Sequence, residues 1–230
     1  MNIIKNIIAI IPARSGSKGI KNKNIKKIYK KTLLEWSIEH CITSKIFRKI
    51  YISTDSIKYA NIVKKYDLVE VILRPKKISK DNSTDYQMIK HAINLINIEY
   101  EYIAHIRPTS PLRKPIYLKK AFDLFKNSNF SSLRTVHEMP ETSYKSFEIK
   151  KNYLKPLNNT NLSIDKLNDP RQNFSKTYFA NGIVDIYKKK FILKNKKLFG
   201  NRVRAFITPY TQEIDNQEDL EYARYLWKKK

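Results

Sequence analysis

Short apolar runs alternate with longer stretches of helical periodicity along most of this chain. The first run, at residues 7–11, has the length and the branched side chains of a strand that is buried on both faces, as in a parallel sheet. The same criteria predict strands at 49–53, 69–73, 102–106, 182–187 and 204–208. Apolar positions at helical spacing predict helices at about 33–43 and 216–227, and around 57–63, 88–96 and 115–125.

Strands that alternate with helices predict a three-layer α/β/α sandwich, a Rossmann-like fold with a mostly parallel sheet. Ligands of such sheets bind beyond the carboxyl ends of the strands. Arg14, Asp55, Arg74 and Arg107 each follow a predicted strand. We therefore expect one rim of the sheet to gather these four side chains.

Several helices have recognisable start signals. Thr32 and Glu35 have the spacing of a capping box for the first helix. Asp55 is expected to cap the second helix, and Asp85 has the position of a cap for the third. Pro115 suits the first position of the fourth helix, where the backbone N–H has no helical partner to lose.

The alternation is lost at about residues 137–176. Short aromatic-rich segments at 144–149 and 153–157 lie there between polar turns. This pattern predicts a strand-rich insertion within a single domain that spans residues 1–230. The apolar side chains of the insertion need a surface to pack against.

Charge favours anionic partners, but its distribution is not that of a nucleic-acid binder. The chain carries 46 Lys and Arg residues against 21 Asp and Glu residues, a formal net charge of +25. A basic nucleic-acid-binding protein without enzymatic activity is therefore one alternative. However, 36 of the cations are lysines that are scattered over the whole sequence, whereas nucleic-acid binders more often cluster arginine and aromatic side chains on one face. We expect no nucleic-acid partner.

The remaining composition limits the environment of the protein. Its single cysteine, Cys41, cannot form an internal disulfide. The four histidines lie far apart, without the spacing of a metal site. No apolar stretch approaches the roughly 20 residues of a membrane span. We expect a cytoplasmic protein with no membrane partner.

The residues after the first strand have the chemistry of an anion site. Two of the chain's four glycines, Gly16 and Gly19, lie close together among hydroxyl and cationic side chains. Such a loop suits a polyphosphate. It matches neither the P-loop nor the dinucleotide fingerprint, so its composition alone leaves an ordinary basic turn about equally open.

Five motifs change this balance. The first strand is followed by A-R-x-x-S-K-G and K-N, and later come RPKKISKDNSTD at 74–85, PTSPLR at 108–113, PRQ followed by NG at 170–182, and EID at 213–215. In identity and order they resemble the cytidylyltransferases that activate sialic acids and related nonulosonic acids as CMP-sugars. The resemblance spans essentially the whole chain.

This resemblance implies a reaction and an assembly. CMP would pass from CTP to the anomeric hydroxyl of a nonulosonic acid, with release of pyrophosphate, for cell-surface glycan synthesis. The protein would be a homodimer in which segment 137–176 is an arm that reaches the other subunit's site. The nearest alternative is an enzyme that activates 3-deoxy-octulosonic acid, but such enzymes look more like R-L-P-G-K-P where this chain has KNKN.

The resemblance also implies a nucleotide site. Its residues would be Arg14, Ser17, Lys18, Lys23, Asn24, Arg74 and Asp85. Lys23 would lie near the α-phosphate, and Arg74 and Asp85 belong to the segment that faces the cytosine and the ribose. Asp85 could equally serve only as a helix cap.

Glu213 and Asp215 are the candidate ligands of a Mg²⁺ cofactor. They alternate on a strand-like segment, so both carboxylates would face one side. Spacing alone also allows a capping box between Asp215 and Glu218 for the last helix. With the resemblance, Asp215 is the metal ligand, assisted by Glu213, and a neighbouring residue caps the helix. Arg14, Lys23 and Asp215 would then form the catalytic set.

The resemblance implies that the acceptor sugar lies against a third group of residues. These are Arg107, Thr109, Ser110, Arg171, Asn181 and Gly182. Arg107 stands where many members have glutamine, and Phe179 stands where some have arginine, which leaves the identity of the sugar open. Arg107 could pair with the acceptor's carboxylate. Alternatively, Arg171 could pair with Asp169 on the surface, and Gly182 could only bend the start of a strand.

Overall fold

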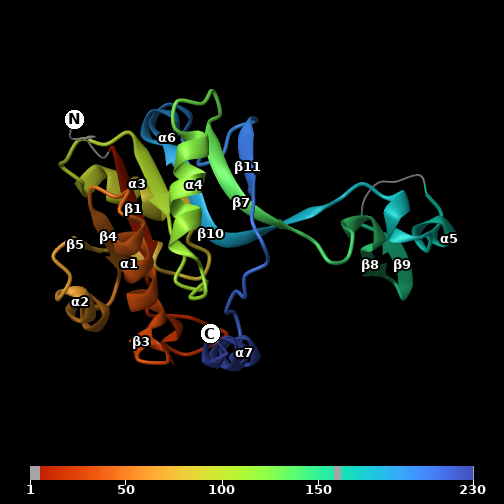
Figure 1. Cartoon of the computed structure of the whole chain (residues 1–230), viewed down its shortest axis with the longest axis horizontal. Helices are drawn as coiled ribbons and strands as arrows, with labels where there is room; N and C mark the ends of the chain where they lie inside the picture. The colour runs from red at the N-terminus through yellow and green to blue at the C-terminus, as the bar shows by residue number, and fades with distance from the viewer. Residues whose placement is uncertain (1–5, 158–161, 230) are drawn as a thin grey trace.

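A seven-stranded sheet forms the centre of the computed structural model, which describes residues 6–157 and 162–229 (Figure 1). The strand order is β11-β7-β10-β6-β1-β4-β5. Neighbouring strands are parallel except at β10, which is antiparallel to β6 and β7. The strands are β1 (Ile7–Pro12), β4 (Ile50–Thr54), β5 (Val69–Leu73), β6 (Tyr102–His105), β7 (Ser132–Glu138), β10 (Tyr178–Lys188) and β11 (Val203–Ile207). The mostly parallel sheet is confirmed.

Helices cover both faces of this sheet (Figure 1). Alternate residues of β1 point to opposite layers: Ile7 and Ile11 pack with α1 (Leu33–Ser44), α2 (Ile57–Val63) and α4 (Pro115–Phe125). Ile8 and Ile10 pack with α3 (Asp85–Leu95) and α6 (Lys189–Asn195) on the other face. The predicted three-layer sandwich is therefore confirmed. Within the described ranges, no helix combines the length and the apolar content needed to cross a membrane.

The last helix closes the sandwich beside the N-terminal loop. α7 (Gln217–Lys228) packs over the small ribbon of β2 (Lys27–Ile28) and β3 (Lys31–Thr32). The rings of Trp36 and Trp227 pack there in a tilted arrangement, with centroids 4.1 Å apart and an angle of 42° between their planes. This contact brings the end of the chain against the segment that follows β1 (Figure 1).

The helix starts follow the sequence prediction only in part. The Thr32–Glu35 capping box is present, and Pro115 opens α4. At three other helices the cap is a residue next to the candidate acid, which was expected only for the last helix. These caps are Ser56 for α2, Thr84 for α3 and Asn216 for α7.

Each displaced acid uses its carboxylate elsewhere. Asp55 accepts hydrogen bonds from the N–H (2.8 Å) and the hydroxyl (3.0 Å) of Ser15. Asp85 and Asp215 pair with cations, as described below. The expected cap at Asp55 was wrong, and the alternative of a cap at Asp85 is not realised, because contacts between distant segments engage these carboxylates. The expectation that a neighbour of Asp215 caps the last helix is confirmed by Asn216.

Besides the short elements β2, β3 and α5 (Ile164–Leu167), the sequence analysis missed β7 and α6, and one predicted strand is longer than expected. β7 and α6 have too few contiguous apolar residues for a clear pattern. β10 begins four residues before the predicted strand. Its pairing with β7 is interrupted between Ala180 and Asp185, where Gly182 has a φ of +61°. Because of this irregular segment, the alternation of apolar residues does not reveal where the strand begins.

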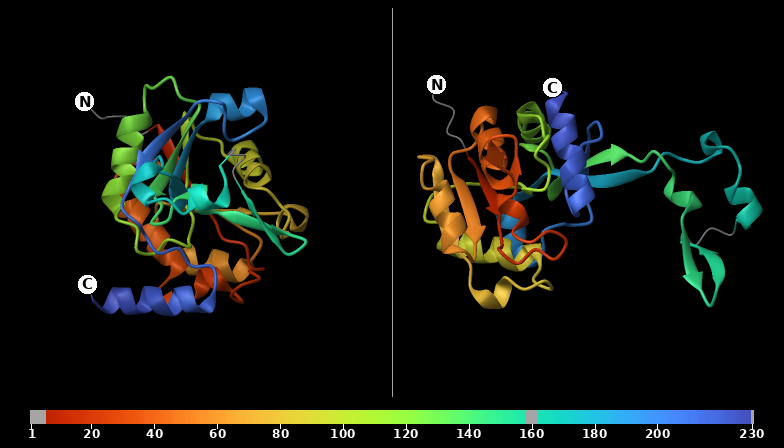
Figure 2. Two further views of the ribbon diagram at one scale, coloured as in Figure 1. Left: turned by 90° about the vertical axis from the view of Figure 1, so that its right-hand side faces the viewer. Right: turned by 90° about the horizontal axis from the view of Figure 1, so that it is seen from below.

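The segment between β7 and β10 projects from the sandwich as an arm (Figures 1 and 2). It carries a hairpin of β8 (Phe147–Lys150) and β9 (Tyr153–Pro156), and the short helix α5 (Ile164–Leu167). Ile149 and Tyr153 of the hairpin are each 76% exposed. The arm therefore presents apolar side chains that the rest of the described chain leaves uncovered.

One histidine lies fully buried inside the sheet. His105 of β6 is 0% exposed and lies opposite Asp185 of β10. Burial, together with the nearby Arg107, lowers the pKa of His105 to about 4, against the opposing effect of Asp85 and Asp185. The imidazole is therefore neutral in the folded protein at neutral pH.

The buried imidazole predicts a pH-dependent stability. Between pH 7 and pH 5 the unfolded state takes up a proton on His105 that the folded state does not, so stability falls as the pH falls. From a pKa near 6.5 unfolded and about 4 folded, the loss is about 2 kcal/mol. Denaturant unfolding of the wild type and of His105→Gln at both pH values measures it. Equal losses in the two proteins would contradict this assignment.

Candidate active site

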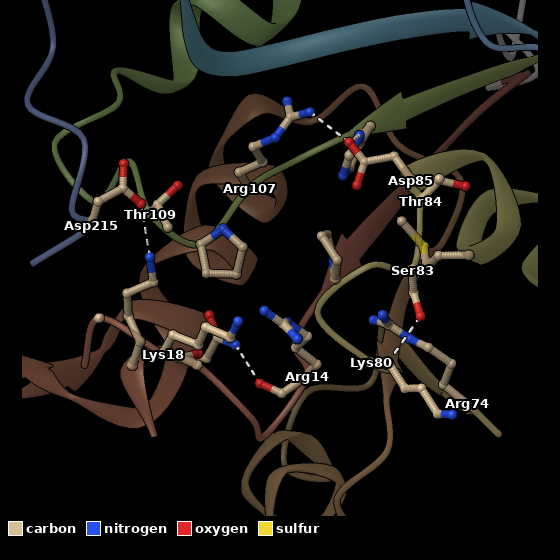
Figure 3. Close-up of a pocket in the computed structure, with 18 residues that line it drawn as sticks. Arg14, Lys18, Arg74, Lys80, Ser83, Thr84, Asp85, Arg107, Thr109 and Asp215 are labelled. Atoms are coloured by element: carbon tan, nitrogen blue, oxygen red, sulfur yellow. Dashed lines mark hydrogen bonds and ion pairs between the residues drawn. The ribbon is translucent and has the colours of Figure 1, made fainter. Parts of the chain in front are cut away.

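A cavity of about 360 Å³ opens at the carboxyl ends of the parallel strands (Figure 3). Six cations and two acids line it: Arg14, Lys18, Lys23, Arg74, Lys80, Arg107, Asp85 and Asp215. Pro12, Ser17, Gly19, Asn24, Ser83, Thr84, Met88, His105, Pro108 and Thr109 complete the lining. The site therefore carries an excess of positive charge where the fold predicts ligand binding.

The loop after β1 is held in place at its base. Asn24 is buried, and its Nδ2 donates to the carbonyl of Arg14 at 2.9 Å. This bond and the contacts between Ser15 and Asp55 fix the backbone on both sides of the loop. The cationic side chains are thus carried by a backbone that is already ordered.

Asp81 forms ion pairs with two cationic side chains of this loop. Arg14 Nη1 lies 2.6 Å from Asp81 Oδ1, and Lys18 Nζ lies 3.1 Å from Asp81 Oδ2. The arginine and the lysine lower the pKa of Asp81, so this carboxylate is ionised. One protein carboxylate therefore bridges two cations that line the cavity, although Asp81 itself is not part of the lining.

Lys23 joins the loop to the far end of the chain. Its Nζ donates to the carbonyl of Ile214 and to Asp215 Oδ1, both at 2.9 Å. Gly19 makes the approach possible, because a Cβ at that position would lie 2.2 Å from the Asp215 carbonyl oxygen. The structure thus brings Lys23 and Asp215, 192 residues apart, to one wall of the cavity.

Arg74 forms the opposite wall (Figure 3). Its Nη2 donates to the carbonyl of Ser53 at 2.7 Å and its Nε donates to the Ser53 hydroxyl at 3.2 Å. The residue is 8% exposed, and burial lowers its pKa. The end of β4 therefore holds this guanidinium in a single orientation beside Lys80 and Ser83.

Arg107 lies between two carboxylates at a third side of the cavity. Its Nη1 donates to Asp185 and its Nη2 donates to Asp85, both at 2.9 Å. Asp185 is 2% exposed, whereas the Asp85 side chain is 49% exposed. Both ends of the guanidinium fork are therefore paired, one with a buried and one with an accessible carboxylate. Figure 3 shows the pair with the accessible Asp85.

Five of the predicted site residues do not line this cavity. Ser110 and Asn181 are buried, and Asn181 Nδ2 donates to the Thr208 hydroxyl at 2.7 Å. Gly182 lies against Glu213, where a Cβ would approach Oε1 to 2.7 Å. Arg171 lies in the arm and pairs with Glu138 at 3.0 Å, not with Asp169. The fifth is Glu213.

The acidic pair splits between two environments. The segment 213–215 is irregular and not a strand, and only Asp215 lines the cavity. Glu213 accepts a hydrogen bond from the Thr109 hydroxyl at 2.8 Å, so the predicted common face of the two acids is not formed by strand alternation. The Asp215 side chain is 75% exposed and open to a ligand.

The donor chemistry fits a divalent cation that arrives with a phosphate ligand. Among residues 6–157 and 162–229, no three His, Cys, Asp or Glu side chains gather as a metal site of their own. Mg²⁺ commonly binds through one or two carboxylates together with substrate phosphates. Asp215 provides such a carboxylate at the cavity wall, and Glu213 lies two residues away, behind Thr109.

Several contributors were missed by the sequence analysis. Arg113, the last residue of PTSPLR, is 2% exposed and donates to the carbonyls of Arg107 (2.7 Å) and Gly182 (3.2 Å), joining the turn after β6 to β10. Asp185 is the only charge in the apolar run GIVDIY, a signal that could have found it. Asp81 lay within a quoted motif, but its partners could not be read from that motif.

Comparisons with known proteins agree with this geometry. A model of the cytidylyltransferase family matches residues 8–230. An N-acylneuraminate cytidylyltransferase from Escherichia coli is 32% identical in an alignment that covers 97% of this chain and 52% of that protein. A pseudaminic acid cytidylyltransferase from Campylobacter jejuni is 29% identical in an alignment that covers 98% of this chain and 97% of that protein.

The fold has a counterpart among solved structures. A CMP-2-keto-3-deoxy-manno-octonic acid synthetase complexed with CTP gives a TM-score of 0.73 over 97% of this chain and 98% of that one, at 13% identity. At that identity the likeness concerns the fold alone. The chain spans about half the length of the Escherichia coli relative. Because the family model covers the sheet, the cavity loops and the arm alike, the chain belongs to the cytidylyltransferase family.

Proposed function

We propose that this protein transfers CMP from CTP to the anomeric hydroxyl of a nonulosonic acid of the sialic type and releases pyrophosphate, as a step in cell-surface glycan synthesis. The observation that carries the proposal is the cavity in which Arg14, Lys18 and Lys23 meet Asp215. The names of the Escherichia coli and Campylobacter jejuni relatives support the class of acceptor.

The proposed reaction needs charge neutralisation and alignment more than covalent catalysis. The sugar hydroxyl attacks the α-phosphorus of CTP, a new P–O bond forms, and the bond to the pyrophosphate oxygen breaks. Arg14, Lys18 and Lys23 would neutralise the triphosphate, with Lys23 at the α-phosphate. Ser17 and Asn24 would hold the nucleotide, and Arg74 would face the base from its fixed position on Ser53.

Asp215, assisted by Glu213, would hold Mg²⁺, whose charge neutralises phosphate oxygens and lowers the pKa of the attacking hydroxyl. Lys23 contacts Asp215 in the free protein. Binding of the nucleotide would therefore exchange this ion pair for contacts between Lys23 and the phosphate. Lys23 would then contact the phosphate, and Asp215 would bind the metal.

The acceptor would enter on the side of Arg107 and Thr109. A nonulosonic acid carries a carboxylate, and a guanidinium fork suits it. In the free protein Asp85 holds one end of that fork. Besides the nucleotide contact that the resemblance implies, Asp85 would therefore bind Arg107 until the acceptor arrives.

The activity assay is direct. CTP and Mg²⁺ are incubated with the protein and N-acetylneuraminic, legionaminic or pseudaminic acid, and pyrophosphate release is followed. We expect release with at least one of these acids and none without an acceptor. Absence of pyrophosphate with all three would overturn the proposed function.

The matched control for this assay is Asp215→Asn. The substitution keeps the size of the side chain and removes the charge that would bind the metal, so turnover should be lost while the unfolding temperature stays within a few degrees. Full activity in this variant would refute the metal assignment without touching the assignment of the substrate.

Asp81 should compete with the triphosphate for Arg14 and Lys18. We expect Asp81→Asn to lower the KM for CTP by roughly two- to fivefold, because the free cations no longer have to release a carboxylate. Asp123→Asn is the matched control, since Asp123 forms a similar exposed pair with Lys126 at 2.6 Å, on α4. An unchanged or higher KM for CTP would show that Asp81 does not compete.

We further propose that the protein acts as a cytoplasmic homodimer joined through the arm. Ile149, Tyr153, Leu154 and Leu157 are each more than half exposed, and covering apolar surface of this kind stabilises association. Light scattering of the wild type should give twice the 27.3 kDa mass of the chain. The double variant Ile149→Glu with Tyr153→Glu should give the mass of a monomer. A monomeric wild type would exclude this assembly.

A further inference from the structure

A single buried carboxylate organises the acceptor side of the cavity. Asp185 lies on β10, in register with His105 of β6 and Arg134 of β7. It does not line the cavity, and it is 2% exposed. Arg107 Nη1 donates to its Oδ2 at 2.9 Å, and Arg134 donates through Nε to Oδ1 at 3.0 Å and through Nη2 to Oδ2 at 3.1 Å.

The ionised states of Asp185, Arg107 and Arg134 stabilise one another. Burial alone would raise the pKa of Asp185, but hydrogen bonds and charges from Arg134 and Arg107 outweigh it and lower the pKa. Asp185 therefore stays ionised. One carboxylate cannot balance two guanidinium groups, and the second negative charge is that of Asp85, bound to Arg107 Nη2 at 2.9 Å.

The geometry gives the two carboxylates different roles toward Arg107. A guanidinium is planar and rigid, so fixing Nη1 on a buried partner sets the direction of Nη2. That nitrogen points to the cavity, where its partner Asp85 is 49% exposed at the start of α3 (Figure 3). Asp85 can be displaced by a ligand, whereas Asp185 cannot be reached by one.

We propose, on the basis of the proposed function, that Asp185 is a positioning residue that holds Arg107 for the carboxylate of the acceptor sugar. In the free protein the Asp85 carboxylate binds Arg107 where the acceptor carboxylate would bind. It releases Arg107 when the acceptor binds. The acceptor site therefore selects sugar acids through a guanidinium whose direction is set from inside the sheet. Arg134 shares the buried carboxylate but does not line the cavity.

A purely structural role for Asp185 makes a different prediction. Replacing a buried carboxylate that balances two partly buried arginines destabilises the fold whatever the substrates are. A positioning role acts through Arg107 alone. It therefore changes the KM for the acceptor and spares the KM for CTP, and its effect vanishes when Arg107 is absent.

The experiment is a double-mutant cycle on steady-state kinetics with CTP and the best acceptor acid. We expect Asp185→Asn to raise the acceptor KM roughly tenfold or more, because Arg107 is no longer held by a charged hydrogen bond. The KM for CTP should stay within about twofold. In an Arg107→Gln background, adding Asp185→Asn should change the acceptor KM by less than about twofold.

Two further variants complete the test. Arg134→Gln leaves the bond between Asp185 and Arg107 in place, so its acceptor KM should remain within about threefold of the wild type. The double variant Asp185→Asn with Arg134→Gln removes one charge of each sign. The net charge of the cluster is therefore unchanged. If the single Asp185→Asn variant does not fold, the acceptor KM is measured with this double variant instead.

The outcomes separate this inference from the proposed function. A wild type that releases no pyrophosphate with any of the acids refutes the function itself. An active wild type whose acceptor KM is unchanged by Asp185→Asn, alone or with Arg134→Gln, refutes the positioning role. So does an increase of equal size with and without Arg107, because the effect would then not pass through that side chain.

Discussion

The cavity depends on the bond between Lys23 and the segment that precedes α7. One ammonium group donates to the Ile214 carbonyl and to Asp215, across 192 positions of sequence. The contact is possible because Gly19 has no Cβ to meet the Asp215 carbonyl and because α7 packs on the ribbon after the loop. Without it, the cationic loop and the acid would belong to separate surfaces, and the site that we propose for a triphosphate and a metal would not form.

Carboxylates of the protein hold several of its cations before any ligand arrives. Asp81 bridges Arg14 and Lys18, Asp215 takes Lys23, and Asp85 takes the accessible end of Arg107. Cations gathered in a cavity repel one another, and nearby acids relieve this repulsion. Anion binding at such a site is therefore an exchange of partners, and the strength of each internal pair sets part of the affinity for the ligand. The more exposed pairs are the easier ones to exchange, because water screens them.

The candidate site could be predicted from the sequence as far as its residues follow strands. Arg14, Arg74 and Arg107 line the cavity because parallel strands end at one rim, and a pattern of strands gives their positions. Arg171, Asn181 and Glu213 do not line it, although they lie in motifs of the same family. Arg171 lies in the projecting arm, and Asn181 and Glu213 are held behind the wall by bonds to Thr208 and Thr109. Motif membership does not say on which side of a wall a side chain lies.

Most strands and helices of the sandwich, its layers and the cationic loop were determined by the sequence alone, because hydrophobic periodicity and chain punctuation are local properties. The tertiary structure decided which acid pairs with which cation. Asp55, Asp85 and Asp215 have the sequence signature of helix caps, yet contacts with distant residues engage all three carboxylates and leave the caps to Ser56, Thr84 and Asn216. The choice depends on the positions of residues tens to hundreds of places apart, and only the folded sheet brings those together.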